Sequence, residues 1–377
     1  MEFKNIKTSI ITVFAIVFSL YNVSAQNRTA DFVAINHFFD SISMIGKIQK
    51  MDSVFKSMVK DKKFNGTILI AKNGKTLYQN HSGYADFVTK KKLTTSSQFE
   101  IASVSKQFTA VAILMLYEQN KLKLTDTVQK FIPDFPYKGI TVHQLLCHRS
   151  GLPDYFKFAE KYHPNKKVIM NNDSLLRMMK RYQPKIIEKP DKKFEYSNTG
   201  YAVLASIVER VSGISFVEFV NRHIFNVLGM KESYFYLHGE PQDGGYTTGH
   251  KSNNKPYERD IESGVMGDKG IFTTVNDLLI WDNALYSAKI LKPETLKMAF
   301  SPKNPENSPC NNYGYGWRLS CDDYGNKLIY HGGLWNGNNS LFLKRLSDEI
   351  LIVFLSNLYN RGFSGKSGDF LLIFDEL

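Results

Sequence analysis

The spacing of apolar residues changes several times along this chain and predicts where its helices and strands lie. Apolar residues recur every third or fourth position between residues 31 and 63, a spacing typical of a helix. Residues 64–86 predict a β-hairpin, because two apolar runs flank Asn73-Gly74, a dipeptide typical of two-residue hairpin turns. A continuous apolar run over 109–116 then predicts a buried helix.

Helical spacings dominate the middle of the chain, from residue 124 to about 257. Three helices are expected at 141–146, 201–212 and 215–228. Gly213 and Gly229 stand where the last two should stop, because glycine readily takes the left-handed conformation that ends a helix. The polar, glycine-rich residues 239–257 predict a long surface loop.

Strand patterns return near the end of the chain. Four strands are expected at 315–319, 327–330, 340–343 and 350–355. The order is therefore sheet, helices, sheet, which favours an α+β fold over a βαβ repeat. We expect an antiparallel sheet flanked by helices and closed by both ends of the chain, with an inserted, mainly helical lobe. The sheet lobe would comprise about 26–123 and 258–377, and the helical lobe about 124–257.

The first residues have the pattern of a secretory signal. Lys4 and Lys7 precede an apolar run over 10–20, and small residues follow up to Ala25, where cleavage is expected. The run is shorter than the roughly 20 apolar residues that a transmembrane helix needs. We therefore expect a signal peptide over 1–25, a mature domain over 26–377 with no stable membrane anchor, and a periplasmic or secreted location. An uncleaved membrane anchor is the alternative.

Charge and cysteine content limit the classes of partner. The formal net charge is +12, but lysines are spread along the whole chain, whereas a nucleic-acid footprint would be concentrated. A diffuse basic surface suits anionic cell-wall or carboxylate substrates. Cys310 and Cys321 are close enough to pair in an oxidising compartment, although the sequence does not decide whether they do, and Cys147 is expected to be a buried apolar residue. No metal-binding spacing occurs, so we expect neither a metal nor a cofactor.

The candidate chemistry begins at Ser103, which is followed by Lys106 at the start of the apolar helix. Residues three positions apart share one face of a helix, so the lysine can remove the proton that keeps a serine hydroxyl a poor nucleophile. The same Ser-x-x-Lys spacing occurs twice within residues 53–60, but that stretch is lysine-rich and typical of a solvated helix face. Its context therefore favours Ser103.

Two later segments supply the other groups that such a nucleophile needs. Tyr196-Ser197-Asn198 offers a phenol for proton transfer and an amide for holding a substrate. The same Tyr-x-Asn spacing at Tyr78 lies on the hairpin and is not expected to contribute. Residues 330–333 end a predicted strand with two glycines, along which a substrate backbone could approach.

Together these segments resemble a known family. In the same order, Ser103-x-x-Lys106, Tyr196-x-Asn198 and His331-Gly332-Gly333 look like the three motifs of the serine β-lactamase and penicillin-binding-protein superfamily. The likeness is greater to its class C β-lactamase, D,D-peptidase and esterase branch. It covers nearly all of the chain after residue 25 and extends to flanking segments such as 145–152 and 313–317.

The resemblance implies a role for each matching residue. Ser103 would be the acylated nucleophile, Lys106 and Tyr196 would share the work of general base, and Asn198 would hold a substrate amide. The family usually ends with a long helix packed on the sheet, whereas only residues 368–377 remain for it here.

The third motif departs from the commonest pattern. His331 stands where many relatives have lysine, so it could still donate a hydrogen bond or a proton but would grip a substrate carboxylate more weakly. Gly332 and Gly333 would lie along the substrate. The backbone N–H groups of Ser103 and Leu334 would form an oxyanion hole.

We therefore expect an exported serine hydrolase that forms an acyl-enzyme on Ser103. Its substrates would be D-amino-acid peptides or amides, small esters or β-lactams, with the cell wall as one source. A true class C-type β-lactamase is one alternative, and a catalytically silent protein that binds cell-wall peptides or assembles with partners is another. His148, in the flanking segment, is expected to be a structural turn residue rather than a catalytic base.

Overall fold

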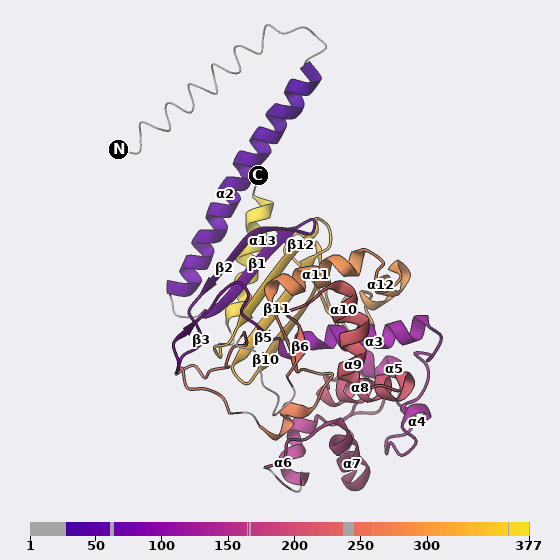
Figure 1. Ribbon diagram of the computed structural model, residues 1–377. Helices are drawn as coiled ribbons and strands as arrows, with labels where there is room; N and C mark the ends of the chain where they lie inside the picture. Colours follow the sequence, from indigo (N-terminus) through magenta and orange to yellow (C-terminus); the bar gives the residue numbers. More distant parts are fainter. Residues whose placement is uncertain are drawn as a thin grey trace.

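A seven-stranded sheet in which neighbouring strands run antiparallel forms the centre of the molecule (Figure 1). The computed structural model describes residues 28–60, 64–163, 165, 167–236, 245–258, 260–360 and 362–376. The strands are β1 (Gly66–Lys72), β2 (Lys75–Ser82), β8 (Asn311–Tyr313), β9 (Arg318–Cys321), β10 (Lys327–Trp335), β11 (Asn338–Arg345) and β12 (Ile350–Ser356), in the order β2-β1-β12-β11-β10-β9-β8. The expected α+β fold with an antiparallel sheet is confirmed.

Strand β1, the first strand of this sheet along the chain, pairs with β12, the last. The predicted hairpin is formed by β1 and β2, and its turn residues Asn73 and Gly74 have φ values of 51° and 71°. Positive φ at both positions is what a twisted two-residue hairpin requires, which explains the Asn-Gly pair.

The expected signal peptide over 1–25 lies outside the described residues. Within the described chain, no helix is both long and apolar enough to cross a membrane.

The later strands differ in extent from the prediction. The strand expected at 315–319 begins only at Arg318, after a bend in which Gly316 has φ of 90°. The strand expected to end at residue 333 continues to Trp335. Strand β8 was missed because its Asn-Asn-Tyr sequence has little strand propensity, and it forms by pairing with β9.

Helices cover both faces of the sheet. On one face, α2 (Arg28–Lys60) and α13 (Ser367–Asp375) form a core with Ile68 and Ile70 of β1. The other face buries Leu69 and its alternating neighbours against α3 (Lys106–Glu118) and α11 (Val275–Tyr286). The terminal helix is thus the short one for which the sequence leaves room, and α2 shares its face of the sheet (Figure 1).

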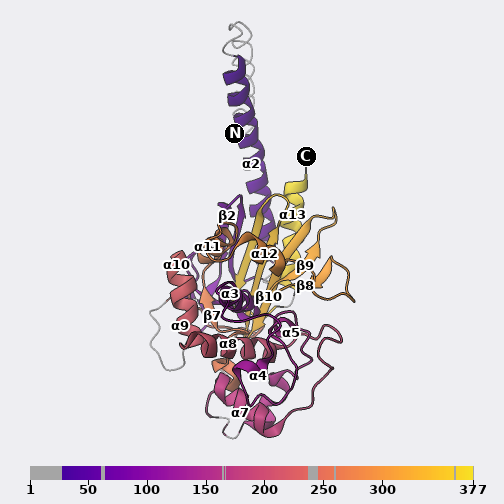
Figure 2. The same ribbon diagram turned by 90° about the vertical axis from the view of Figure 1, so that its right-hand side faces the viewer.

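Most of the remaining helices gather at the end of the molecule opposite the free end of α2 (Figure 2). They are α4 (Val128–Phe131), α5 (Val142–Leu146), α6 (Ala159–Tyr162), α7 (Asn172–Tyr182), α8 (Asn198–Ser212) and α9 (Phe216–Val220), whereas α10 (Asn226–Leu228) contacts α11, and α12 (Pro293–Ala299) lies beside the sheet. A π-helical turn over Asn221–Phe225 joins α9 to α10. Helix α5 begins with a capping box between Thr141 and Gln144, and α8 and α10 end at left-handed Gly213 and Gly229, as predicted. Helices α7, α11 and α12 were not predicted.

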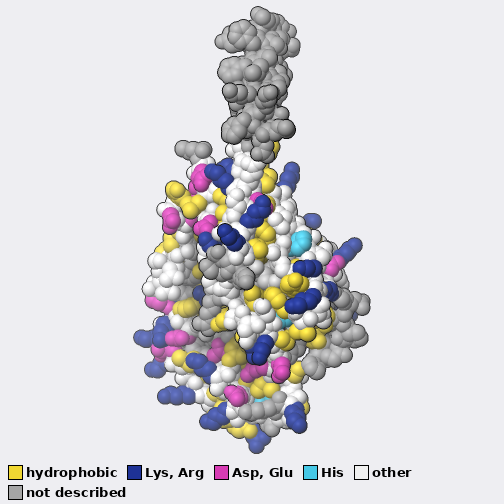
Figure 3. Space-filling view, turned by 90° about the vertical axis from the view of Figure 1, so that its left-hand side faces the viewer, with side chains coloured by type: hydrophobic (Ala, Val, Ile, Leu, Met, Phe, Trp, Pro, Cys, Tyr) yellow, Lys and Arg dark blue, Asp and Glu magenta, His cyan; other side chains and the backbone are white. Residues whose placement is uncertain are grey.

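Two short sheets and a disulfide complete the fold. β3 (Tyr84–Asp86) pairs with β4 (Lys91–Lys92), and β5 (Phe99–Glu100), β7 (Ile271–Thr273) and β6 (Tyr234–Phe235) form a three-stranded sheet. Cys310 and Cys321 form a disulfide, which the sequence left undecided, whereas Cys147 is free and buried, as expected. On the face shown in Figure 3, basic side chains are interspersed with acidic ones. That face therefore has no single basic patch.

Candidate active site

Ser103 lies in a 3-10 turn over Ala102–Ser105 that leads directly into α3. Ile101, which precedes the turn, makes two backbone hydrogen bonds that fix where the turn begins. Its N donates to Ile271 O (2.9 Å), and its O accepts from Ser340 Oγ (2.6 Å). Ala102 has φ of 46°, an uncommon conformation for a non-glycine residue. These contacts fix the backbone that presents Ser103 to the pocket.

Lys106 is fully buried beneath Ser103. Its Nζ lies 3.0 Å from Ser103 Oγ, 2.9 Å from Asn198 Oδ1 and 2.9 Å from the backbone oxygen of Asp268. The last two are carbonyl oxygens, which only accept hydrogen bonds. Lys106 Nζ therefore donates to both carbonyl oxygens and also lies within hydrogen-bond reach of Ser103 Oγ.

The competing Ser-x-x-Lys matches have a different setting. Ser53, Lys56, Ser57 and Lys60 are all exposed on α2. Lys56 pairs with Asp52 (2.6 Å), an interaction typical of a solvated helix face. The context of Ser103, rather than the spacing alone, distinguishes the buried pair.

Tyr196 and Asn198 reach the same site from the start of α8. Tyr196 donates its hydroxyl hydrogen to Ser103 Oγ (3.1 Å), and its ring centre lies 5.1 Å from Lys106 Nζ. Ser197 caps the helix by accepting a hydrogen bond from Gly200 N, so that Asn198 is the first helical residue. The structure thus brings Ser103, Lys106, Tyr196 and Asn198 together.

His148 packs against the ring of Tyr196 and binds the backbone next to it. Its ring lies 4.2 Å from that of Tyr196, and its Nδ1 accepts from Ser197 N (3.1 Å). Burial, followed by the positive charge of Lys106, holds the pKa of His148 well below its usual range. A neutral, fully buried ring with φ of 58° agrees with the structural role expected for this residue.

Strand β10 carries the third motif in its interior rather than at its end, which corrects the sequence-based prediction. Strand β9 pairs with β10 only as far as Tyr330, so residues 331–335 present an edge without a β9 partner toward the pocket. A Cβ on Gly333 would lie 2.3 Å from Ile101 O, whereas one on Gly332 would meet only Ser340 O at 3.7 Å. The close approach of β10 to the Ser103 turn therefore requires glycine at 333.

His331 is buried and has both ring nitrogens engaged. Nδ1 lies 2.8 Å from Gly332 O, which only accepts, so this nitrogen carries the hydrogen and Nε2 accepts from the Tyr313 hydroxyl (3.1 Å). Burial, then the charges of Arg318 and Lys106, hold the pKa of His331 well below its usual range. The imidazole is therefore neutral, and donating to a substrate would require it to give up the contact with Gly332.

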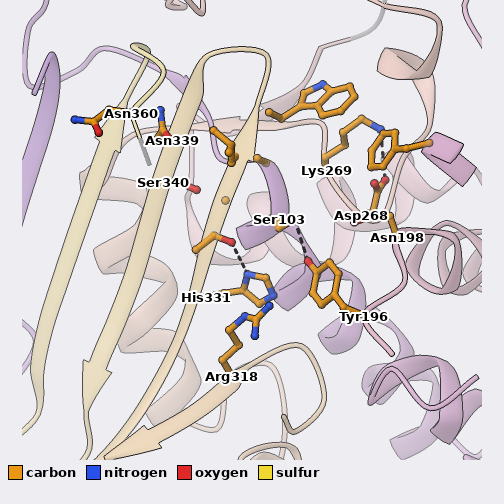
Figure 4. A pocket seen from close by; sticks show the side chains of 16 residues that line it. Ser103, Tyr196, Asn198, Asp268, Lys269, Arg318, His331, Asn339, Ser340 and Asn360 are labelled. Atoms are coloured by element: carbon orange, nitrogen blue, oxygen red, sulfur yellow. Dashed lines mark hydrogen bonds and ion pairs between the residues drawn. The ribbon is translucent and has the colours of Figure 1, made fainter. Parts of the chain in front are cut away.

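Arg318 was not identified from the sequence. It is the first residue of β9, pairs in register with Tyr330 beside the third motif, and lines the pocket below Ser103 (Figure 4). Its guanidinium lies 5.2 Å from the Tyr196 ring centre. Among the described residues, none places a carboxylate within ion-pair distance of it. A basic residue following the 313–317 segment was the only sequence signal.

A cavity of about 480 Å³ is lined by Ser103, Tyr196, Asn198, Arg318 and His331, among others. Figure 4 shows Tyr196, His331 and Arg318 on one side of Ser103, and Asp268 and Lys269 on another. The remaining wall includes residues that sequence reasoning missed: Phe156 and Trp335, whose rings stack at 4.8 Å, and Asn339 and Asn360. The predicted oxyanion-hole residue Leu334 also lines the cavity.

Across the described part of the chain, no three His, Cys, Asp or Glu residues are grouped to hold a metal ion.

Comparison with known proteins gives matches along most of the chain. The family described as Beta-lactamase matches residues 51–373. Penicillin-binding protein 4* of Bacillus subtilis (strain 168) is 33% identical over 325 residues, which cover 82% of this chain and 72% of that protein. D-amino acid amidase from Ochrobactrum anthropi SV3, complexed with D-phenylalanine, superposes with a TM-score of 0.74 at 22% identity, covering 88% of this chain and 99% of the other. A class C beta-lactamase gives a TM-score of 0.73 at 20% identity, covering 88% and 96%. These last two likenesses concern the fold alone.

Proposed function

Since this chain belongs to the beta-lactamase family, we propose that it is a serine hydrolase that forms an acyl-enzyme on Ser103. The observation that carries the proposal is the position of Ser103 Oγ, 3.0 Å from Lys106 Nζ and 3.1 Å from the Tyr196 hydroxyl. A nucleophile within hydrogen-bond reach of a base, which is in turn oriented by other groups, is the arrangement that covalent catalysis requires.

In the proposed acylation step, Ser103 Oγ forms a bond to the substrate carbonyl carbon and loses its proton to Lys106 or Tyr196. The carbonyl oxygen becomes an oxyanion, held by the backbone N–H groups of Ser103 and Leu334. Each such donor is typically worth about 3–4 kcal/mol in the transition state. The bond to the leaving group then breaks as that group takes up the proton, and water later hydrolyses the ester on Ser103.

We propose D-amino-acid peptides or amides and β-lactams as substrates ahead of small esters. Because His331 is neutral, Arg318 is the cation on that side of the pocket that could attract a substrate carboxylate. This contact would offset the weaker grip expected from replacing lysine by histidine. The alternatives remain a true class C-type β-lactamase and a silent cell-wall peptide-binding or assembly protein.

We further propose that the enzyme is exported to the periplasm or secreted. The support is the pattern of Lys4, Lys7 and the apolar run that ends before Ala25. Its partner there would be a small-molecule or peptide substrate, with the cell wall as one source.

The test compares the wild type with Ser103→Ala. Both proteins are incubated with a fluorescent fluorophosphonate and with a chromogenic cephalosporin. Labelling of the wild type alone would support an activated Ser103, and rapid cephalosporin turnover would then favour the β-lactamase alternative. Equal labelling of both proteins, or of neither, would contradict the mechanism and favour the silent binding protein.

A further inference from the structure

The side chain of Asn198 lies between two groups of opposite hydrogen-bonding character. Its Oδ1 accepts from Lys106 Nζ (2.9 Å), and its Nδ2 donates to Asp154 Oδ2 (2.9 Å). Asp154 is outside the three motifs and has no part in the acyl-transfer steps. The contact therefore needs a separate explanation.

Only one orientation of the Asn198 amide satisfies both neighbours. An ammonium group has donors only, and an ionised carboxylate has acceptors only. Rotating the amide by 180° would set its NH₂ against Lys106 and its oxygen against Asp154, and both contacts would become repulsive. In the observed orientation one hydrogen of Nδ2 is used by Asp154, and the other remains for a ligand in the pocket that Asn198 lines.

Asp154 is itself held in place by its neighbours. Its Oδ1 accepts from Phe156 N (3.2 Å), which caps a short 3-10 turn. Thr199 Oγ1 donates to Pro153 O (2.6 Å) and accepts from Tyr155 N (2.8 Å). The segment that carries Asp154 is therefore fixed in register beside Asn198.

The same segment also reaches the third partner of Lys106. The hydroxyl of Tyr155 donates to Asp268 Oδ2 (2.9 Å), while the backbone oxygen of Asp268 accepts from Lys106 (2.9 Å). Burial raises the pKa of Asp154, and the hydrogen bonds from Phe156 N and Asn198 oppose that rise by favouring the ionised form. The segment 154–155 therefore contacts both Asn198 and Asp268, the two residues whose carbonyl oxygens accept from Lys106.

We propose that Asp154 is a positioning residue that sets the orientation of the Asn198 amide, so that its free N–H meets an amide carbonyl on the acyl side of the substrate. This inference rests on the proposed function, in which Asn198 holds a substrate amide, and adds the residue that orients Asn198. Compounds whose acyl group carries its own amide, as in an N-acylated amino acid or a peptide, should be preferred over simple acyl esters.

The experiment uses two esters with the same leaving group, p-nitrophenyl acetate and the p-nitrophenyl ester of N-acetyl-D-alanine. Only the second has an amide carbonyl in its acyl group. The readout is the ratio of kcat/KM for the second ester to that for the first. The wild type should prefer the N-acetyl ester, and Asp154→Asn should lower the ratio about tenfold, the usual scale of one hydrogen bond that involves a charged group. An amide at 154 would offer Asn198 a donor as well as an acceptor, so Lys106 alone would still favour the observed orientation of the Asn198 amide.

Three further proteins make the outcome specific. Asp154→Ser can still cap Phe156 N but lacks the carboxylate, so its ratio should fall similarly; it replaces Asp154→Asn if that variant does not fold. Asp173→Asn removes an exposed carboxylate from the same group of helices and should leave the ratio unchanged. In an Asn198→Ala background, Asp154→Asn should no longer change the ratio.

The possible failures differ from one another. If Ser103-dependent hydrolysis occurs but the ratio is the same in the wild type and both Asp154 variants, the inference is wrong and the proposed function stands. An equal loss with both esters would show a merely structural role for Asp154 and would also overturn the inference. If the wild type hydrolyses neither ester faster than Ser103→Ala does, the proposed function fails and the inference fails with it.

Discussion

Charge around Ser103 is set by a few individual side chains. Lys106 is buried beneath the nucleophile, Arg318 lies on the side of the third motif, and His331 between them is neutral. A histidine in place of lysine would by itself leave this side of the pocket uncharged. We therefore propose that Arg318 would be the group that recognises a substrate carboxylate on this side of the pocket.

Replacing that guanidinium should have a selective effect. Arg318→Gln is expected to lower kcat/KM about tenfold or more for a D-alanyl-D-alanine peptide with a free carboxylate, because a charge-assisted contact is lost. The same peptide with an amidated C-terminus should be affected much less. Steady-state kinetics on both peptides measure the difference. Arg318→Lys is the control and should keep part of the preference; an equal loss with both peptides would contradict the assignment.

The neutral state of His331 predicts a pH profile. Because its pKa is held well below the usual range by burial and by Arg318 and Lys106, the imidazole should stay unprotonated as pH falls from 8 through the ordinary histidine range. Any acidic limb of kcat/KM near pH 6.5 should therefore persist in His331→Gln. Rates measured in the two proteins across this range test the expectation. A limb present in the wild type and absent from the variant would show that His331 titrates there.

Strand β10 brings the third motif next to the turn that carries Ser103. Strand β10 lies against the Ser103 turn, and the pairing of β9 stops at Tyr330, so that the rest of β10 borders the pocket. The sequence predicted that the third motif ends a strand, whereas continued pairing with β11 carries β10 on to Trp335. Glycine at 333 reflects that close contact rather than the end of the strand.

Adding one methyl group along β10 should separate two effects. In Gly333→Ala the new Cβ would meet Ile101 O at 2.3 Å and push β10 away from the nucleophile, so acylation should slow by about 100-fold, the scale of a misplacement near 1 Å. Gly332→Ala, which meets only Ser340 O at 3.7 Å, is the matched control and should lose much less. Fluorophosphonate labelling rates measure acylation directly. Equal losses in both variants would contradict this account.

The stability of the whole molecule depends in part on a buried ion pair that joins α11 to the sheet. Lys344 Nζ on β11 lies 2.6 Å from Asp282 Oδ2, and both side chains are almost completely buried. Removing one partner of such a pair leaves an unpaired charge in the interior, whereas replacing both is much less costly.

A double-mutant cycle tests this coupling. Asp282→Asn should lower the free energy of unfolding by about 3–5 kcal/mol, and Asp282→Asn combined with Lys344→Met should recover most of it. Denaturant unfolding of the four proteins provides the measurement. Additive losses in the double variant would show that the two charges do not interact.

Local sequence patterns were sufficient for the features that local chemistry controls. The Asn73-Gly74 turn, the capped helix α5, the glycine stops of α8 and α10 and the three ordered motifs could all be predicted, because each depends on residues close together in the chain. The α+β fold followed from their order. Helices α7, α11 and α12 escaped prediction although local signals were present: Asn171 and Ser174 form a capping box, Thr274 caps α11 and Pro293 begins α12. Strand β8 escaped because pairing with β9 forms it more than its own propensity does.

Only the tertiary structure decided which distant side chains meet. Lys106 contacts Asn198 and Asp268, which lie 92 and 162 residues further along the chain, and Asn198 in turn contacts Asp154. The tautomer of His331 and the position of Arg318 beside it likewise follow from Tyr313 and from the register of β9 with β10. Such contacts depend on how elements pack, whereas spacing along the chain reports only the face of an element on which a residue lies. The sequence by itself therefore determined the α+β fold and the three ordered motifs, and packing decided which side chains meet around Ser103, their charge and their orientation.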